Sequence, residues 1–275
     1  MIPYSSAIQG NGLDIKITDD IYILNTADRV VVVGGTYSGW TLAIIEYVKK
    51  IGKEFIYLEL AYIGDTAANL AWHRPSKAIV SSDYSKSVLS EAWDPATIYV
   101  GGSPQLDFVP EFKPVYTLEK ANKVLIYTSV CSPDSMEALK SVFESLLQSN
   151  YEVVVRLHPR ESFYGSYWDK SGAVLQDRSQ TLSEALSDSR YAIGVLGTFN
   201  SVLAASGVPT AVVMESSNRG APTEFLPYLH IWNKEESIDL NLSAIDKIAN
   251  SGKDCTPVVG PIGGSAKRII REILR

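Results

Sequence analysis

The sequence contains little of what several classes of protein depend on. Only two of its 275 residues are cysteines, and Cys131 and Cys255 lie far apart, so neither a disulfide framework nor a zinc cluster is indicated. With 25 Lys and Arg against 31 Asp and Glu, the net charge is −6. This balance argues against a nucleic-acid binder, which needs a Lys/Arg-rich face, and against a polybasic membrane anchor.

Long apolar runs are also missing. No stretch approaches the ~20 residues of a membrane-spanning helix, so no transmembrane segment is expected. The N-terminus lacks the charged-then-apolar order of a signal peptide, and the cytoplasm is therefore the expected location. The motifs H-E-x-x-H and G-x-S-x-G are absent, as are Asp-rich metal motifs. We therefore expect no metal site and no resident cofactor.

Short β-branched runs alternate with amphipathic stretches through both halves of the chain. Strands are predicted at residues 29–33, 54–58, 78–80, 97–100, 124–127, 151–156, 173–175, 191–195 and 210–214. Helices are predicted between them and at 266–275. Such alternation predicts an α/β fold of two doubly wound, Rossmann-like domains facing across a cleft, with a short N-terminal domain.

The boundary between the two domains is predicted from a segment without periodicity. Residues 107–121 contain Pro110 and Pro114, as a linker would. We therefore expect an N-terminal domain over 1–115 and a C-terminal domain over 116–275. The last helix is a candidate to pack back on the N-terminal domain.

Ligands of open α/β sheets bind outside the carboxyl ends of the strands, so the residues after each predicted strand are candidates. Arg156 and His158 follow the strand 151–155, and Pro159 ends that strand at the histidine. An imidazole can donate a hydrogen bond to a phosphate, and an arginine can bind one with two hydrogen bonds. The alternative interpretation is a surface His-Pro turn.

Two further candidate loops follow later strands. Small polar residues at a helix N-terminus offer N–H groups and hydroxyls to an anion; here they are Gly197, Thr198, Asn200 and Ser201. An ordinary helix cap is the alternative. The segment 215–220 contains Ser217 and Arg219, which would bind a sugar or phosphate or form a solvated loop.

The first half of the chain offers weaker candidates. The loop Gly34–Gly39 is similar to a phosphate-binding loop but matches neither G-x-G-x-x-G nor the P-loop. Its polar residues Thr36, Tyr37 and Ser38 are candidate ligand-binding residues. Glu59 and Asp65 are candidate acid/base carboxylates, although most carboxylates are merely solvated. His73 and His230 show no partner pattern.

Three motifs together resemble the GT-B glycosyltransferases. Ser81–Lys86 followed by Gly102-Ser103-Pro104-Gln105-Leu106-Asp107 is similar to the end of their N-terminal domain. Arg156-Leu157-His158-Pro159 resembles the His-Pro motif of bacterial sialyltransferases, Kdo transferases and CDP-glycerol-type polymerases. Asn200-Ser201 and the stretch Ala204–Pro209 resemble their serine motif and the helix that bears it. The resemblance covers roughly residues 77–215.

The resemblance implies an activity and roles for particular residues. It implies transfer of a sugar or polyol phosphate from a nucleotide-activated donor, CMP- or CDP-linked, to a carbohydrate or lipid-linked surface-polysaccharide acceptor. His158 and Ser201 would contact the donor phosphate, with Thr198 and Asn200 nearby. The resemblance also implies that the C-terminal domain binds the nucleotide-sugar and that the N-terminal domain, with Thr36, Tyr37 and Ser38, lies on the acceptor side. The nucleotide-sugar is a co-substrate, and the oligomeric state is left open. The alternatives are a nucleotide-sugar 2-epimerase or hydrolase of the same fold and a non-catalytic binding module, which the short N-terminal domain favours.

Overall fold

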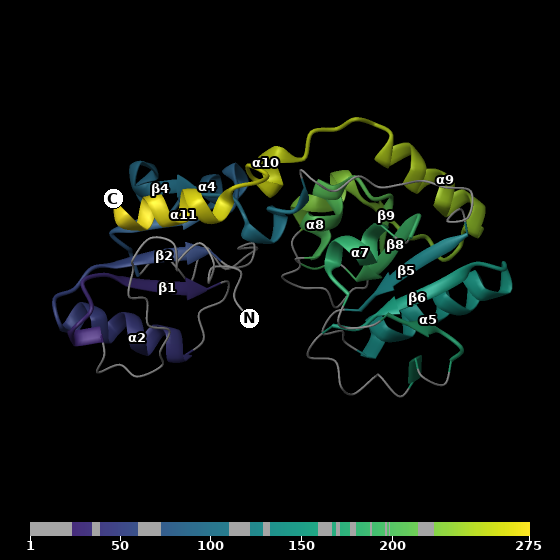
Figure 1. Cartoon of the computed structure of the whole chain (residues 1–275), viewed down its shortest axis with the longest axis horizontal. Coiled ribbons are helices and arrows are strands. Elements are labelled where there is room, and N and C mark those ends of the chain that lie inside the picture. Colours follow the sequence, from purple (N-terminus) through teal and green to yellow (C-terminus); the bar gives the residue numbers. More distant parts are fainter. Residues whose placement is uncertain are drawn as a thin grey trace. The chain divides into compact units, whose positions relative to one another are not determined.

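The computed structural model describes residues 24–34, 39–59, 73–109, 122–128, 133–158, 167–168, 171–176, 180–187, 189–195, 197, 199–213 and 223–275. The contacts divide the chain into two units. Unit 1 consists of Met1–Pro110 together with Cys255–Arg275, and unit 2 is Glu111–Asp254. Each unit contains one parallel sheet with helices on its faces (Figure 1).

Unit 1 has a four-stranded sheet whose strands follow one another in chain order. The strands are β1 (Val30–Gly34), β2 (Phe55–Glu59), β3 (Lys77–Val80) and β4 (Ile98–Val100), and all pairs are parallel. Right-handed crossovers in one direction place successive helices on the same face. Helices α2 (Gly39–Lys50) and α4 (Asp83–Leu89) accordingly contribute to a single core cluster, through Ile45, Val48 and Leu89.

The opposite face of this sheet is covered by the last helix, α11 (Ser265–Leu274). Its Ile269 packs with Ile56, Leu58 and Ile79 of β2 and β3. In Figure 1, α2 and α11 lie on opposite sides of the strands. Residues 255–275, which follow unit 2 in the chain and include the short helix α10 (Thr256–Val259), thus complete the core of unit 1.

The turn that begins at Gly102 holds α11 in place. Asp107 follows the short 3-10 helix η4 (Pro104–Leu106), and its carboxylate accepts hydrogen bonds from the N–H groups of Ser265 and Ala266 at 2.8 and 3.2 Å. Two N–H groups at the start of α11 are thereby satisfied, and the negative charge is favourable at this end of a helix. Gly102 has φ +85°, and a Cβ there would lie 2.5 Å from the Ser265 hydroxyl.

Unit 2 has a six-stranded parallel sheet of order β10-β9-β8-β5-β6-β7. Its strands are β5 (Lys123–Tyr127), β6 (Glu152–Arg156), β7 (Val174–Leu175), β8 (Tyr191–Val195), β9 (Thr210–Val213) and β10 (His230–Ile231). If the six strands of this sheet are numbered 1 to 6 along the chain, their order from the β7 edge is 3-2-1-4-5-6, which is the Rossmann order. The order reverses between β5 and β8, which form the topological switch point.

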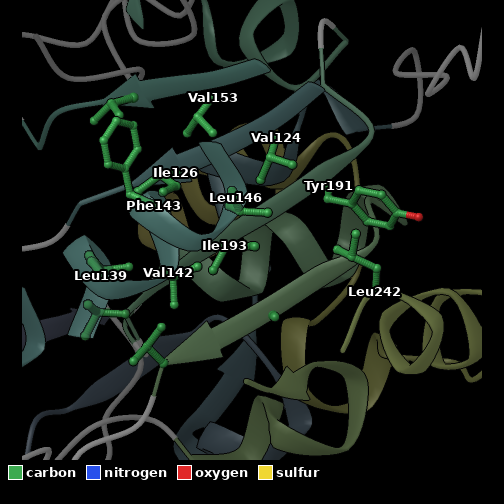
Figure 2. Packing of buried hydrophobic residues seen from close by; sticks show 14 of the residues in the cluster. Val124, Ile126, Leu139, Val142, Phe143, Leu146, Val153, Tyr191, Ile193 and Leu242 are labelled. Carbon is green, nitrogen blue, oxygen red and sulfur yellow. The ribbon is translucent and has the colours of Figure 1, made fainter. Parts of the chain in front are cut away.

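One face of this sheet packs against α5 (Pro133–Gln148), which begins with a proline. Figure 2 shows Leu139, Val142, Phe143 and Leu146 of α5 among the strand residues Val124, Ile126, Val153 and Ile193. Leu242 of α9 (Ile238–Ala249) belongs to the same cluster. On the other face, the ring of Tyr127 meets Phe199 of α8 (Phe199–Ser206).

A capping box stabilises the start of α7 (Leu182–Ser187). The Thr181 N–H donates to the Glu184 carboxylate at 2.7 Å, and the Glu184 N–H donates back to the Thr181 hydroxyl at 3.3 Å. Among the described elements of unit 2, three were not predicted from the sequence: β10, α9 and the 3-10 helix η7 (Thr223–Tyr228).

Candidate functional site

The candidate site lies at the carboxyl edge of the unit-2 sheet. Because the strands are parallel, β5, β6 and β8 all end at this edge. His158 lies two residues beyond β6, and a turn that includes Gly197, Asn200 and Ser201 (the 197–201 turn) follows β8. Both strands pair with β5, so the two loops stand about 10 Å apart, twice the spacing between strands, on either side of the β5 end. This is also the switch point, where ligands of such sheets bind.

The His158 loop is held by Thr128, the residue after β5. The Thr128 N–H donates to the Arg156 carbonyl at 3.0 Å, which continues the strand pairing by one residue. The His158 N–H donates to the Thr128 hydroxyl at 2.9 Å. Thr128 is buried and His158 is half-buried. The backbone that carries the imidazole is therefore fixed by the neighbouring strand.

The 197–201 turn is held by the side chain of Asn200, which is completely buried. Its Oδ1 accepts from the Gly197 N–H, and its Nδ2 donates to the Tyr127 hydroxyl at 2.6 Å. The Asn200 N–H donates to the Gly197 carbonyl at 3.0 Å. The fold therefore uses both ends of the Asn200 amide to build the turn. Ser201, also buried, lies in the first turn of α8.

Tyr127 bridges β5 to the turn. Its ring meets the Phe199 ring edge-on, with 4.9 Å between centroids and 63° between planes. Burial raises the pKa of Tyr127 far above its usual range, more than the Asn200 hydrogen bond lowers it, so the phenol stays neutral. The ring lies over Gly194, its register partner on β8. A Cβ on Gly194 would approach the ring carbons to 2.3 Å.

Arg156 is directed toward the other side of β6. Its Nη1 donates to the Gln176 side-chain oxygen at 2.8 Å, just beyond β7, and lies 3.5 Å from the Gln180 carbonyl. Partial burial lowers the pKa of the guanidinium, which remains a cation at neutral pH. The carboxyl end of β5 thus brings together His158 and the 197–201 turn. The Arg156 side chain instead forms its hydrogen bonds on the β7 side of the sheet.

Glu59 ends β2 in unit 1 and is buried. Its Oε2 accepts from the N–H and hydroxyl of Ser81 at 2.5 and 2.6 Å, and its Oε1 accepts from the Ser85 hydroxyl at 2.8 Å. These hydrogen bonds tie the end of β2 to the start of α4 and stabilise the carboxylate as an anion. This arrangement gives Glu59 a structural role, and its acid–base role stays a prediction.

Several predicted site residues lie outside the described residues: Thr36, Tyr37, Ser38, Asp65, Thr198, Ser217 and Arg219. The two other histidines have partners within their own units: His73 lies 3.3 Å from the Glu46 carboxylate, and His230 lies 2.9 Å from the Asn241 amide oxygen. Among the described residues, no group of three or more His, Cys, Asp or Glu could hold a metal ion. None of the described helices has the length and apolar character needed to cross a membrane.

Tyr127, Thr128 and Gly194 were not predicted from the sequence as site residues. Two signals could have found them. Tyr127 and Thr128 stand at the carboxyl end of a predicted strand, where ligands and their supporting residues gather. Gly194 interrupts an apolar strand, and an isolated glycine in a strand often marks the close approach of another group.

Solved structures are similar to the chain, although no protein-family model and no curated protein matches it. The UDP-GlcNAc 2-epimerase of Methanocaldococcus jannaschii, solved with UDP-GlcNAc and UDP, is 15% identical over 93% of this chain and 78% of its own, with a TM-score of 0.64. Staphylococcus aureus MnaA with UDP is 12% identical over 98% and 91%, with a TM-score of 0.65. A His-to-Asn variant of the wall teichoic acid polymerase TagF with CDPG is 14% identical over 89% and 72%, with a TM-score of 0.51.

Identities this low establish the fold alone. The similarity extends over both units, because each alignment covers at least 89% of this chain. Together with the two parallel sheets and the Rossmann strand order of unit 2, it confirms the predicted fold: the chain has the GT-B fold, made of two Rossmann-like units.

Proposed function

We propose that the chain is an enzyme acting on a nucleotide-activated sugar, and that the carboxyl edge of unit 2 between β6 and β8 binds the phosphate of that donor. One observation carries the proposal. The end of β5 braces both candidate loops, through Thr128 to His158 and through Tyr127 to Asn200. Loops fixed in this way at a switch point form a preorganised site.

The chemistry at this edge suits an anion. The first turn of α8 has backbone N–H groups at the positive end of the helix dipole. The His158 imidazole, beyond the end of β6 on the other side of β5, can donate a hydrogen bond to the same anion. As the bond between sugar and phosphate breaks, negative charge grows on the leaving phosphate. Donors that are already in place stabilise this charge without a metal ion.

The leading activity is transfer of a sugar or polyol phosphate from a CMP- or CDP-linked donor to a surface-polysaccharide acceptor. The structural similarity to a teichoic acid polymerase solved with CDPG supports this class of donor. Unit 1 would present the acceptor, and a carboxylate would accept the proton of its hydroxyl. Glu59 and Asp65 are the two candidates for this step. Asp65 is the stronger of them, because Glu59 already accepts three hydrogen bonds.

A 2-epimerase of nucleotide-sugars is the second candidate. It is favoured by the similarity to an epimerase solved with UDP-GlcNAc and UDP. The two activities differ in a simple respect. An epimerase converts UDP-GlcNAc without an acceptor, whereas a transferase releases its nucleotide in step with an acceptor.

Calorimetry with UDP, CDP and CMP tests the shared part of the proposal. The wild-type chain is expected to bind at least one of the three. His158→Ala removes a charge-assisted hydrogen bond, worth about 1.5–3 kcal/mol, and should weaken binding by about 10- to 100-fold. His230→Ala is the matched control, since the His230 ring bonds Asn241 on the β10 side of the sheet, and it should leave the affinity within twofold.

Two results would contradict the proposal. Absence of binding to all three nucleotides would remove the donor site. Equal affinity of His158→Ala and the wild type would remove His158 from it. A chain that binds a nucleotide but neither transfers nor epimerises a matching donor would instead be the non-catalytic binding module.

A further inference from the structure

We infer that Tyr127 is a positioning residue for the donor phosphate: its buried hydroxyl fixes Asn200, and Asn200 fixes the 197–201 turn. The inference rests on the proposed function for the role of the turn. It assigns a purpose to three features that nothing else in the site explains, namely the buried Tyr127 hydroxyl, the fully buried Asn200 and the glycine at position 194.

The first step is the orientation of the Asn200 amide. Gly197 N–H is a donor only, so the group facing it must be the amide oxygen. The amide nitrogen then faces the Tyr127 hydroxyl at 2.6 Å. Turning the amide over would set two donors against each other at Gly197. The hydrogen bonds therefore permit one orientation, and Tyr127 supplies one of its two ends.

The second step is the fixed place of the hydroxyl itself. Tyr127 is buried, its ring is held edge-on by Phe199, and it fits only because Gly194 has no side chain. The ring cannot move toward β8, and the backbone at Tyr127 is paired with strands on both sides. The hydroxyl is thus a rigid reference point between β5 and the turn.

The third step concerns what the turn presents to a ligand. Asn200 and Ser201 lie in the first turn of α8, so a shift of Asn200 also displaces the first N–H groups of that helix. Positioning errors near 1 Å cost a reaction as much as about 100-fold. Because the phenol stays neutral, its contribution is geometric and should be the same at every pH where the chain is folded.

Tyr127→Phe tests the inference, since it removes the hydroxyl and keeps the ring. The matched control is Tyr191→Phe. Tyr191 begins β8 at the opposite end of the same sheet, and its hydroxyl donates to the Asp246 carboxylate at 3.0 Å. Both variants lose one tyrosine hydrogen bond, but only Tyr127→Phe loses one at the site.

The two variants are compared by nucleotide affinity and by amide exchange. The probe is whichever of UDP, CDP and CMP the wild type binds. Tyr127→Phe should lower its affinity by about 5- to 50-fold, equally at pH 6.5 and 8.5, and Tyr191→Phe by less than twofold. In NMR, the Gly197 amide proton should exchange with solvent about tenfold faster in Tyr127→Phe than in the wild type. In Tyr191→Phe its exchange rate should be unchanged.

Each outcome decides something. A wild type that binds no nucleotide overturns the proposed function. A Tyr127→Phe variant that binds as tightly as the wild type, or whose Gly197 amide exchanges at the wild-type rate, overturns the inference while leaving the proposed function intact. If Tyr127→Phe does not fold, Gly194→Ala takes its place, because it displaces the ring and keeps the hydroxyl. Its affinity must then fall as well.

Discussion

Gly194→Ala is the smallest change that tests how the candidate site is built. A Cβ at this position would lie 2.3, 2.4 and 2.6 Å from three carbons of the Tyr127 ring. All three distances are about 1 Å or more below the ~3.5–4.0 Å of a favourable carbon contact. Gly194 does not have the positive φ that would penalise alanine, so the expected cost is purely steric.

The size of this cost follows from the rigidity of both neighbours. Strand pairing holds the backbones of Tyr127 and Gly194 in register, so the ring must leave its place. Overpacking of this kind costs about 1–3 kcal/mol. For a domain of this size, each kcal/mol lowers the melting temperature by about 2–4 °C. We therefore expect a decrease of about 2–12 °C, measured by thermal unfolding and checked by urea unfolding with an unchanged m value.

A double-mutant cycle identifies the cause. In a Tyr127→Ala background the ring is absent, so the added methyl group has room and Gly194→Ala should cost little more. The coupling between the two positions should then be about 1–3 kcal/mol. If Gly194→Ala costs the same with and without the ring, the contact with Tyr127 does not explain the glycine, and the account of the site's construction is wrong.

Two further predictions concern helix ends. Asp107→Ala should lower the stability of unit 1 by about 0.5–2 kcal/mol and increase amide exchange at Ser265 and Ala266, because α11 loses its cap; unchanged exchange at both amides would contradict this. Hydrogen bonds from Thr181 lower the pKa of Glu184, so its folded pKa lies below the unfolded one. The resulting stability is present above the unfolded pKa and is lost as the pH falls through the folded pKa. Glu184→Gln should therefore reduce the loss of unfolding free energy at acid pH, measured by urea unfolding at pH 3–7. A pH dependence identical to that of the wild type would refute the prediction.

The fold was predictable where the pattern is local. Strands β5, β6, β8 and β9 begin and end within a residue or two of the bounds predicted from their apolar runs. Such runs are reliable signals because strands covered on both faces need continuous apolar side chains. Helix α9 was missed although its signals were present. Ser237 caps its first turn, and Leu242 and Ile245 repeat at helical spacing. The capping box of α7 is likewise a local signal, because Thr181 and Glu184 lie within four residues of each other.

The candidate site was only partly predictable. His158 and the 197–201 turn follow predicted strands, and the strand-end rule places them at one edge. The role of Asn200 could not be read in this way, because its partner Tyr127 is 73 positions away in the chain. The same holds for Glu59, which meets Ser81 and Ser85 only when β2 and β3 pair. In both cases a polar residue proposed for chemistry has hydrogen bonds that build the fold.

The sequence by itself determined the class of fold, the alternation of strands and helices, and the loops that carry His158 and Ser201. These depend on side-chain periodicity and on caps, which act over a few residues. The tertiary structure alone decided the strand order of unit 2, and with it the switch point beside Tyr127. The last helix was a candidate from the sequence to pack on the N-terminal domain, and the tertiary structure decided that it covers the sheet face opposite α2 and α4. Both outcomes depend on burying apolar surface between segments that are distant in the chain. A local sequence pattern does not specify which distant segment will pack against it.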